Sequence, residues 1–250
     1  MKTRGNTVLI TGGATGIGFA LAEAFSKAGG AVIICGRREN KLREAYAKLP
    51  LIGTLVCDVS KRRERESLYR WARENHPEIN ILINNAGIQK MVDLTRGARD
   101  LFRGEDEIAT NFVAPVHLSA LFVPLLSGQK AAAIINISSG LGFVPIAAMP
   151  VYCATKAAVH SFTVSLRHQL KDTSIRVFEI VPPMVDTDLG RDTTEEPQSG
   201  YRGIPPAQVA TETLRALRRD EFEILVGEAT DLVARSRSEP EKAFTEMNSW

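Results

Sequence analysis

The chain has 250 residues, of which 44 % are hydrophobic and 24 % charged; this is ordinary globular usage and excludes a disordered or fibrous protein. Its 31 basic and 29 acidic side chains leave a formal net charge of +2, too small to attract nucleic acid or an anionic membrane by its field alone. A length of 250 residues fits one α/β domain, so we expect a single domain over residues 1–250.

Short, strongly apolar runs alternate along the chain with segments of helical periodicity. Seven runs predict β-strands, over residues 7–10, 31–35, 54–57, 79–83, 133–137, 175–181 and 223–226. Six segments predict helices, over residues 16–28, 39–48, 61–74, 105–126, 152–170 and 206–219. The runs are almost continuously apolar, which indicates parallel strands covered on both faces. We therefore predict an α/β fold, a single doubly wound domain with a seven-stranded parallel sheet flanked by helices.

Two stretches and the C-terminal end do not fit this alternation. Residues 89–104 show neither pattern, and residues 187–203 are rich in Asp, Thr, Glu, Pro and Gly, a composition typical of a surface loop. We expect residues 187–203 to form a substrate loop. Residues 228–250 are expected to form a charged, peripheral C-terminal tail, either a helix or a partly disordered end.

A glycine-rich segment joins the first predicted strand to the first predicted helix. Its glycines allow a tight turn and a close approach of the backbone to a pyrophosphate, whose charge the helix N-terminus stabilises. The segment therefore predicts a dinucleotide-binding Rossmann domain, in which the cofactor contacts Gly12, Ala14, Thr15, Gly16, Ile17 and Gly18. A plain glycine-rich turn is the alternative.

The second predicted strand ends in Cys35-Gly36-Arg37-Arg38, where an NAD-binding protein offers a carboxylate to the ribose 2′-hydroxyl. This sequence has no carboxylate there. Arg37 and Arg38 can instead form charge-assisted hydrogen bonds with the 2′-phosphate of NADP. The pattern favours NADP (NADPH) over NAD, and two solvated arginines at the start of a helix are the alternative.

Tyr152 and Lys156 lie four residues apart and share one face of a predicted helix. An unperturbed tyrosine has a pKa of about 10 and is a poor base near neutrality. Because a neighbouring ammonium favours the ionised phenol, we expect Lys156 to lower the pKa of Tyr152 and make it a general acid and base. A tyrosine packed beside a solvated lysine is the alternative if this pair is taken alone.

Two further motifs connect these segments to one family. Ser139 follows the predicted strand 133–137 in the context Asn-Ile-Ser-Ser-Gly, and Asn111 lies upstream in Thr-Asn-Phe. With the TGxxxGxG and YxxxK motifs, in this order, they resemble the short-chain dehydrogenase/reductase superfamily over nearly the whole chain. Residues 83–89, 144–152 and 182–187 resemble its DltE-type oxidoreductases. The resemblance implies a catalytic tetrad of Asn111, Ser139, Tyr152 and Lys156.

The resemblance also implies further cofactor contacts. It assigns the adenine to Asp58 and Val59, a partly structural element to Asn85, Ala86 and Gly87, the nicotinamide ribose to Tyr152 and Lys156, and the nicotinamide to Pro182, Val185 and Thr187. Asn111 would hold a water that connects Lys156 to solvent. Pro183 departs from the family pattern, which has glycine at this position, because proline lacks an N–H and restricts the backbone.

The substrate is expected between the catalytic groups and an apolar wall. Ser139 would polarise the substrate oxygen and Tyr152 would protonate it during reduction. Ser139 is preferred to Ser138 because successive residues of a strand face opposite ways. The wall would consist of Leu141, Phe143 and Met149, which favours a hydrophobic or aromatic ketone or aldehyde.

These residues predict an NADPH-dependent oxidoreductase that transfers hydride between NADP(H) and a ketone, aldehyde or secondary alcohol, as a carbonyl reductase or alcohol dehydrogenase acting on CH–OH donors. Two alternatives remain open: a non-catalytic NADP-binding redox sensor, and an enzyme of the same fold that acts on a sugar or acyl substrate. The family pairs the helices predicted over residues 105–126 and 152–170 between subunits, which implies a homodimer or homotetramer.

The remaining signals bear on metals and location. The histidines share no metal-ligand spacing, so we expect no metal site. Cys35, Cys57 and Cys153 are odd in number and lack CxxC spacing, which favours a reducing compartment. We find no signal-peptide pattern, and prolines and polar residues interrupt the apolar stretch 131–159. We expect a cytoplasmic protein whose partner is a small-molecule carbonyl or alcohol, without binding to membrane or nucleic acid.

Overall fold

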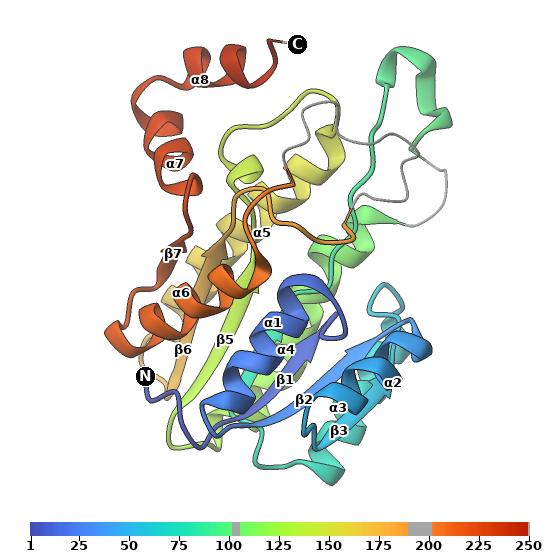
Figure 1. The fold of residues 1–250 in the computed structure, drawn as a ribbon, viewed down its shortest axis with the longest axis vertical. Helices are drawn as coiled ribbons and strands as arrows, with labels where there is room; N and C mark the ends of the chain where they lie inside the picture. Colours follow the sequence, from blue (N-terminus) through green and yellow to red (C-terminus); the bar gives the residue numbers. More distant parts are fainter. Residues whose placement is uncertain (102–105, 190–201, 250) are drawn as a thin grey trace.

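A computed structural model describes residues 1–101, 106–189 and 202–249. Seven strands form one sheet in the order β3-β2-β1-β4-β5-β6-β7, and all neighbours are parallel (Figure 1). The strands are β1 Thr7–Thr11, β2 Ala31–Gly36, β3 Gly53–Val56, β4 Ile81–Asn84, β5 Ala132–Ile137, β6 Ile175–Val181 and β7 Glu223–Leu225. The predicted α/β fold with a seven-stranded parallel sheet is confirmed.

Helices cover both faces of the sheet. They are α1 Gly16–Lys27, α2 Glu39–Lys48, α3 Arg62–Asn75, α4 Ala114–Ser127, α5 Pro150–Gln169, α6 Pro206–Arg219, α7 Ala229–Ser238 and α8 Pro240–Met247. Short 3₁₀ segments, η1 and η3, span Leu94–Arg99 and Gly140–Gly142, and a π-helical segment, η2, spans Ala109–Val113. Helices α1, α2 and α6 pack on one face of the sheet, and α3, α4 and α5 pack on the other (Figure 1).

The alternation of side chains along each strand divides the core between the two faces. In β1, Val8 and Ile10 join the cluster that contains Phe25 of α1, whereas Leu9 joins the cluster that contains Phe122 of α4. All five side chains are fully buried. Burial of a side chain of this size stabilises a fold by about 1.5–3 kcal/mol. Both layers thereby fix the position of the central strand.

The strand order reverses between β1 and β4, which are neighbours in the sheet although about seventy residues separate them. In open α/β sheets, ligands bind outside the carboxyl ends of the strands at such a switch point. The glycine-rich segment leaves β1 at this point. The architecture therefore places the predicted cofactor motif where a ligand is expected.

The helix predicted over residues 105–126 is interrupted in the structure. Residues 109–113 are π-helical and α4 begins only at Ala114; residue 105 lies outside the described residues. Pro115 has no N–H to donate to the carbonyl of Asn111, four positions earlier, so the regular hydrogen-bond ladder cannot pass this point. The interruption falls on one of the predicted catalytic residues.

The C-terminal tail forms the two helices α7 and α8, which lie beyond the carboxyl edge of the sheet (Figure 1). A Cβ added at Gly140 would lie 2.9 Å from Cδ2 of Leu232, so α7 packs directly on η3. Oδ1 of Asn248 accepts a hydrogen bond from the Ala147 N–H at 2.6 Å, and its Nδ2 donates to the Pro145 carbonyl at 3.1 Å. The tail, predicted only to be peripheral, contacts the segment expected to form the substrate wall.

Candidate active site

The glycine-rich loop joins β1 to α1. Gly12 and Gly16 have φ values of 62° and 54°, in the left-handed region that residues with a Cβ rarely adopt. At Gly18, an added Cβ would lie 2.3 Å from the carbonyl oxygen of Gly12. The turn requires the first two glycines, and the packing of α1 against the turn requires the third.

The N-terminus of α1 is suited to an anion. Its N-cap residue, Thr15, makes no capping hydrogen bond, and the first turn carries no acidic side chain. The Thr15 hydroxyl instead accepts a hydrogen bond from Nη2 of Arg38 at 3.1 Å. The first N–H groups of a helix have no partner within the helix, and its dipole is positive at this end. These residues fit the pyrophosphate of a dinucleotide.

Arg37 and Arg38 stand at the carboxyl end of β2, beside the end of β3. Arg38 is the N-cap residue of α2 and reaches the glycine loop. Burial tends to raise the pKa of Asp58, but hydrogen bonds from Ser60 and the nearby charge of Arg37 lower it overall. Two arginines and Asp58 therefore share one rim at the carboxyl ends of β2 and β3.

The chain after β4 is hydrogen-bonded to the glycine loop. Nδ2 of Asn85 donates to the carbonyls of Thr11 and Gly12 at 2.8 and 3.1 Å. The Thr11 hydroxyl accepts hydrogen bonds from the N–H groups of Asn85 and Ala86 at 3.0 and 3.1 Å. These contacts join the carboxyl ends of β1 and β4, and they explain the partly structural role expected for Asn85 and Ala86.

Asn111 lies in the π-helical segment and is buried. Its Oδ1 accepts from the Ile88 N–H at 2.9 Å, and its Nδ2 donates to the Ile88 carbonyl at 2.8 Å and to Oγ1 of Thr155 at 3.2 Å. A Cβ added at Gly87 would lie 3.5 Å from Oδ1 of Asn111 and 3.8 Å from Nζ of Lys156. The amide of Asn111 thus connects the chain after β4 to α5, next to the predicted catalytic lysine.

Tyr152 and Lys156 lie on successive turns of α5 and face the end of β5. Tyr152 is 5 % exposed, and Ser139 is the neighbouring side chain that acts to lower the pKa of its hydroxyl. Nζ of Lys156 donates to the Ile137 carbonyl at 2.9 Å and lies 5.6 Å from the centre of the Tyr152 ring. The hydroxyl of the neighbouring Ser138 donates instead to Oε1 of Glu179 at 2.5 Å. The structure therefore brings Ser139, and not Ser138, to the tyrosine.

The pKa of Tyr152 is raised in the structure, although the spacing predicted that Lys156 would lower it. Burial raises this pKa above its usual value, and the neighbouring Ser139 offsets only part of the effect. Burial also lowers the pKa of Lys156 to about 8, while the charge of Glu179 acts in the opposite direction. The prediction was wrong because it ignored desolvation, which disfavours both charged forms. In addition, the ammonium is directed at the Ile137 carbonyl.

The predicted substrate wall runs from η3 to the start of α5, and Leu141, Phe143 and Met149 are partly buried there. The Leu141 N–H donates to Oγ of Ser139 at 3.1 Å, so this residue adjoins the catalytic serine. The Phe143 ring packs on His160 with 4.5 Å between ring centres, and against a small core cluster at α7. Phe143 therefore contacts β6 and α7, where it supports the wall from behind.

The chain after β6 returns toward the glycine loop. The Pro182 carbonyl accepts from the Gly140 N–H at 3.1 Å, and Val185 forms an isolated parallel bridge. A Cβ added at Gly16 would lie 3.0 Å from Cγ2 of Thr187, so Thr187 touches the glycine loop. The segment, which contains Pro183, thus runs from the end of β5 and η3 to the glycine loop.

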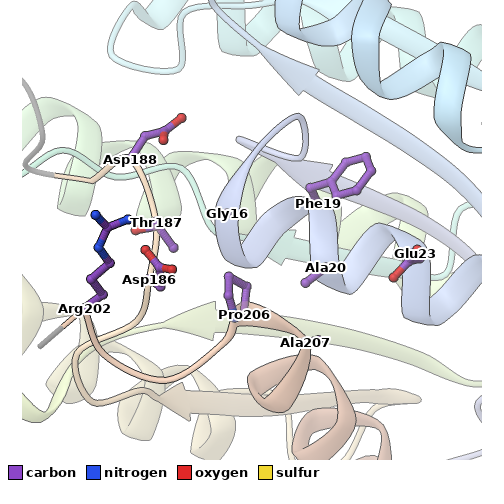
Figure 2. Close-up of a pocket in the computed structure, with 10 residues that line it drawn as sticks. All are labelled: Gly16, Phe19, Ala20, Glu23, Asp186, Thr187, Asp188, Arg202, Pro206 and Ala207. Carbon is purple, nitrogen blue, oxygen red and sulfur yellow. The ribbon is translucent and has the colours of Figure 1, made fainter.

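A cavity of about 420 Å³ lies beside this contact (Figure 2). It is lined by Gly16, Phe19, Ala20, Glu23, Asp186, Thr187, Asp188, Arg202, Pro206 and Ala207. Its lining includes the predicted cofactor contacts Gly16 and Thr187 and, among the described residues, none of the predicted catalytic ones. Of the predicted substrate loop 187–203, residues 190–201 lie outside the described residues.

Several buried charged side chains around the site were missed from the sequence. Nη1 of Arg65 donates to the Val59 carbonyl and so holds the segment expected at the adenine. Oε1 of Glu107 accepts from the Lys90 N–H at 2.9 Å, and burial raises the pKa of Glu107. Glu179 is fully buried in β6. For Glu179, the available signal in the sequence was a charged residue inside an apolar strand pattern, Ile-Arg-Val-Phe-Glu-Ile-Val.

Comparison with known proteins gives the class of protein that the motifs and the geometry of the site indicate. Residues 6–198 match the family model described as short chain dehydrogenase, which covers well over half of the chain. The chain therefore belongs to the short-chain dehydrogenase family of oxidoreductases, and the resemblance seen in the motifs is confirmed.

Individual relatives cover the whole chain. The chain is 49 % identical over 249 residues to the "uncharacterized oxidoreductase DltE" of Bacillus subtilis, covering 100 % of this chain and 99 % of that protein. A short-chain dehydrogenase/reductase from Burkholderia phymatum, solved in complex with NAD, is 25 % identical with a TM-score of 0.83 and coverages of 99 % and 97 %. A short-chain dehydrogenase from Sphingobium yanoikuyae, solved in complex with NADPH, is 26 % identical with a TM-score of 0.79 and coverages of 95 % and 95 %.

Proposed function

We propose that the chain is an NADPH-dependent carbonyl reductase that works in reverse as an alcohol dehydrogenase. The proposal is carried by the buried Tyr152, which has Ser139 beside its hydroxyl and Lys156 one turn later, at the carboxyl end of β5. A phenol whose pKa is raised stays protonated at neutral pH. That is the state required of the acid that protonates a carbonyl oxygen.

A nicotinamide dinucleotide is supported by the solved relatives, one with NAD and one with NADPH. The preference for NADP rests on Arg37 and Arg38 and on the missing carboxylate at the end of β2. The glycine loop would hold the pyrophosphate, and the chain after β6 would adjoin the nicotinamide. When bound, NADPH supplies the hydride that adds to the carbonyl carbon.

The protein's own groups act on the substrate oxygen. Ser139 donates a hydrogen bond to this oxygen, and Tyr152 transfers its phenolic proton to it as the C=O π bond breaks. Lys156 stabilises the phenolate that remains. In the oxidation of an alcohol, the Tyr152 phenolate removes the hydroxyl proton. Asn111 fixes α5 against the chain after β4, so Lys156 stays in place behind Tyr152.

The decisive experiment is NADPH oxidation over a panel of ketones and aldehydes, with NADH in parallel and Tyr152→Phe as the matched variant. We expect apolar carbonyls to be reduced, and the rate of the variant to fall by about 10³-fold while NADPH binding, measured by fluorescence, survives. An unchanged rate in Tyr152→Phe would contradict the catalytic assignment. Binding without turnover on the panel would favour a redox sensor, and a preference for small anionic ketoacids would refute the apolar wall.

We further propose a cytoplasmic homodimer or homotetramer assembled through α4 and α5. Support for assembly comes from exposed apolar residues on these helices and on η2, including Val113 at 42 % and Val164 at 47 % exposure. Support for a reducing compartment comes from the cysteines, because Cys35, Cys57 and Cys153 are free and buried.

A further inference from the structure

The segment between the catalytic serine and Phe143 has few side chains that could fix its position. It contains η3, Gly140–Gly142, in which Leu141 is the only residue with a side chain. A Cβ added at Gly142 would lie 2.9 Å from the backbone carbon of Lys156, so η3 packs directly on α5. Because its glycines carry no side chains, the place of η3 depends on how its two ends are held.

The serine end is held by a carboxylate inside the sheet. Glu179 of β6 is fully buried, and its Oε1 accepts a hydrogen bond from the Ser138 hydroxyl at 2.5 Å. Ser138 directly precedes the catalytic Ser139. Removing a carboxylate from water is strongly unfavourable unless it is paired and hydrogen-bonded, so this contact is kept in the fold.

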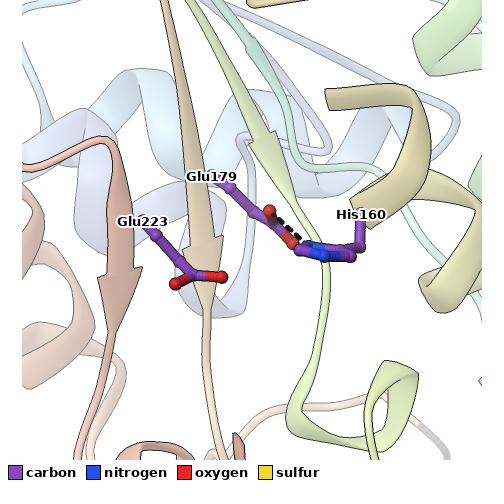
Figure 3. Close-up of side chains that lie close together, drawn as sticks. All are labelled: His160, Glu179 and Glu223. Carbon is purple, nitrogen blue, oxygen red and sulfur yellow. Dashed lines mark hydrogen bonds and ion pairs between the residues drawn. The ribbon is translucent and has the colours of Figure 1, made fainter. Parts of the chain in front are cut away.

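The same carboxylate also holds His160 of α5. Oε2 of Glu179 lies 2.9 Å from Nδ1 of His160 (Figure 3). Because a carboxylate only accepts hydrogen bonds, Nδ1 carries the hydrogen. Glu223, the register neighbour of Glu179 on β7, has a different partner, since Nη2 of Arg237 lies 3.4 Å from it. Glu179 thereby fixes the orientation of the imidazole.

The imidazole of His160 in turn packs against the ring of Phe143. The ring centres are 4.5 Å apart and the ring planes are inclined by 58°. Aromatic rings attract one another at this separation. Phe143 also packs against the small cluster of Val181, Ala229 and Val233. His160 therefore connects the buried carboxylate to the far end of the η3 segment.

We propose that Glu179 and His160 are positioning residues that set the shape of the substrate wall and so determine which carbonyls fit. Glu179 holds the end of the wall at Ser139, and His160, held by Glu179, supports Phe143 at the other end. The inference rests on the proposed function, in which an apolar wall receives the substrate. It gives a role in specificity to two residues that lie behind this wall.

The substitution His160→Asn separates the two contacts of the imidazole. Asparagine keeps an N–H donor near the place of Nδ1 but has no ring to pack on Phe143. We expect KM for acetophenone, an aromatic ketone large enough to need the wall, to rise about three- to tenfold through the loss of one aromatic pair. KM for the small ketone 2-butanone and Kd for NADPH should stay unchanged.

Two substitutions of Glu179 test its anchoring role. Glu179→Met keeps the length of the side chain but removes both hydrogen bonds, so it should raise KM for acetophenone as His160→Asn does. Glu179→Gln can keep both bonds, because its carbonyl oxygen accepts from Ser138 and its N–H donates to the other tautomer of His160. It should behave like the wild-type protein. The contrast between the two substitutions separates the hydrogen bonds from the charge.

A second readout is independent of turnover. Hydrogen exchange of residues 140–149 is measured by mass spectrometry in the full-length protein without substrate. Exchange should be faster in His160→Asn and Glu179→Met and unchanged in Glu179→Gln, because only the first two release the segment. His168→Asn is the matched control, since it makes the same substitution at an exposed position of α5. It should change neither KM nor the exchange.

A rise in KM for acetophenone alone, with faster exchange in His160→Asn and Glu179→Met, would support the proposal. It would be overturned by equal effects on both ketones, by no effect in either variant, or by a loss in Glu179→Gln as large as that in Glu179→Met. If Glu179→Met does not fold, His160→Asn decides the question alone. If the exchange differences occur but the wild-type protein reduces no carbonyl, the proposed function fails while the anchoring of the segment stands.

Discussion

Lys156 and Glu179 are charged side chains with only 5 % and 0 % of their surface exposed. Replacing buried ionic groups by apolar ones of similar volume often stabilises a protein, so keeping them indicates a use other than stability. Lys156 donates its hydrogen bond to a backbone carbonyl and shares the field of Glu179, without a direct ion pair to it among the described contacts. Burial lowers the pKa of Lys156 to about 8, so this side chain is closer to losing its proton near neutral pH than an exposed lysine is.

Lys156→Met should stabilise the folded protein at neutral pH. The pKa of Lys156 is about 8 in the fold, against an ordinary value of 10.5, so the unfolded chain binds more protons between these values. Wild-type stability consequently rises with pH across this window, and below pH 8 the buried cation costs about 3 kcal/mol. Loss of the bond to Ile137 offsets about 1 kcal/mol. Urea unfolding should show a gain of about 2 kcal/mol at pH 7.

This gain should shrink as the pH rises from 8 toward 10.5, because the folded lysine is then already neutral and the unfolded chain gives up its proton more easily. The exposed Lys171 lies just beyond the end of α5, and Lys171→Met provides the control without such a trend. A Lys156→Met protein that is less stable than wild type by the same amount at every pH would refute the argument.

Arg37→Ser should weaken NADPH binding selectively. A charge-assisted hydrogen bond to a phosphate contributes about 2 kcal/mol, so KM for NADPH should rise about 30-fold while KM for NADH changes little. The measurement is steady-state kinetics with both cofactors at saturating carbonyl substrate. Arg43→Ser is the matched control, since Arg43 lies exposed on α2 and pairs with Glu39 at 2.6 Å. Equal losses with NADPH and NADH would exclude recognition of the 2′-phosphate by Arg37.

At the scale of whole elements, apolar patterning predicted the strands closely because parallel strands are buried on both faces. Helices α2 and α6 begin and end where the sequence predicted. The π-helical segment was not predicted, since it depends on the effect of Pro115 on the carbonyl of Asn111. For the tail that forms α7 and α8, the sequence left a peripheral helix and a partly disordered end open, because few of its side chains are buried, notably Ala229, Val233 and Ala243.

The candidate site likewise contains some features that the sequence predicted and others that it could not predict. Tyr152, Lys156 and Ser139 could be predicted because their chemistry requires fixed residue types at fixed spacing, and the structure places them together. The contact between His160 and Glu179 could not be predicted, because it joins α5 to β6 through tertiary packing. The pKa directions could not be predicted either, since they depend on burial.

Asn248→Ala should loosen the substrate wall. Asn248 follows α8 and binds the backbone of both Pro145 and Ala147, so its loss frees the segment between η3 and α5. We expect KM for the carbonyl substrate to rise about three- to tenfold, which corresponds to about 1 kcal/mol, with an unchanged Kd for NADPH. Ser249→Ala is the control, because the Ser249 hydroxyl donates only to the nearby Glu246 carbonyl. An unchanged KM in Asn248→Ala would exclude this role of the tail.

At the scale of the whole molecule, the surface around η2 and α4 is unusually apolar. Residues 109–127 have a mean hydropathy of 1.5 and are 44 % buried, values shared by some membrane spans and by core helices of soluble proteins. A groove of about 400 Å³ beside α3 is lined by Phe112, Val113, Val116 and Ala120, with Arg62, Arg65 and His117. Burial of this surface against a second copy would account for its composition.

Light scattering should therefore give two or four times the chain mass of 27.4 kDa. Val164→Glu places a charge on the exposed face of α5 and should reduce the mass toward that of one chain, because an unpaired charge is disfavoured in an apolar interface. Tyr46→Asp is the control, since Tyr46 is 57 % exposed on α2, away from this surface. A single-chain mass for the wild-type protein would refute the proposed assembly.

The order of the strands in the sheet also affects which part of the chain folds first during synthesis. Strands β3, β2 and β1 are neighbours in the sheet and all lie within the first 56 residues. In contrast, the Thr11 hydroxyl is hydrogen-bonded to Asn85, which is 74 positions further along the chain. Contacts between near neighbours in sequence form first, and domains fold from the N-terminal side during synthesis. On the ribosome, the glycine-rich loop therefore emerges before residues 139–156. A nucleotide bound to this loop would favour the folded state of the nascent chain before Ser139, Tyr152 and Lys156 have been made.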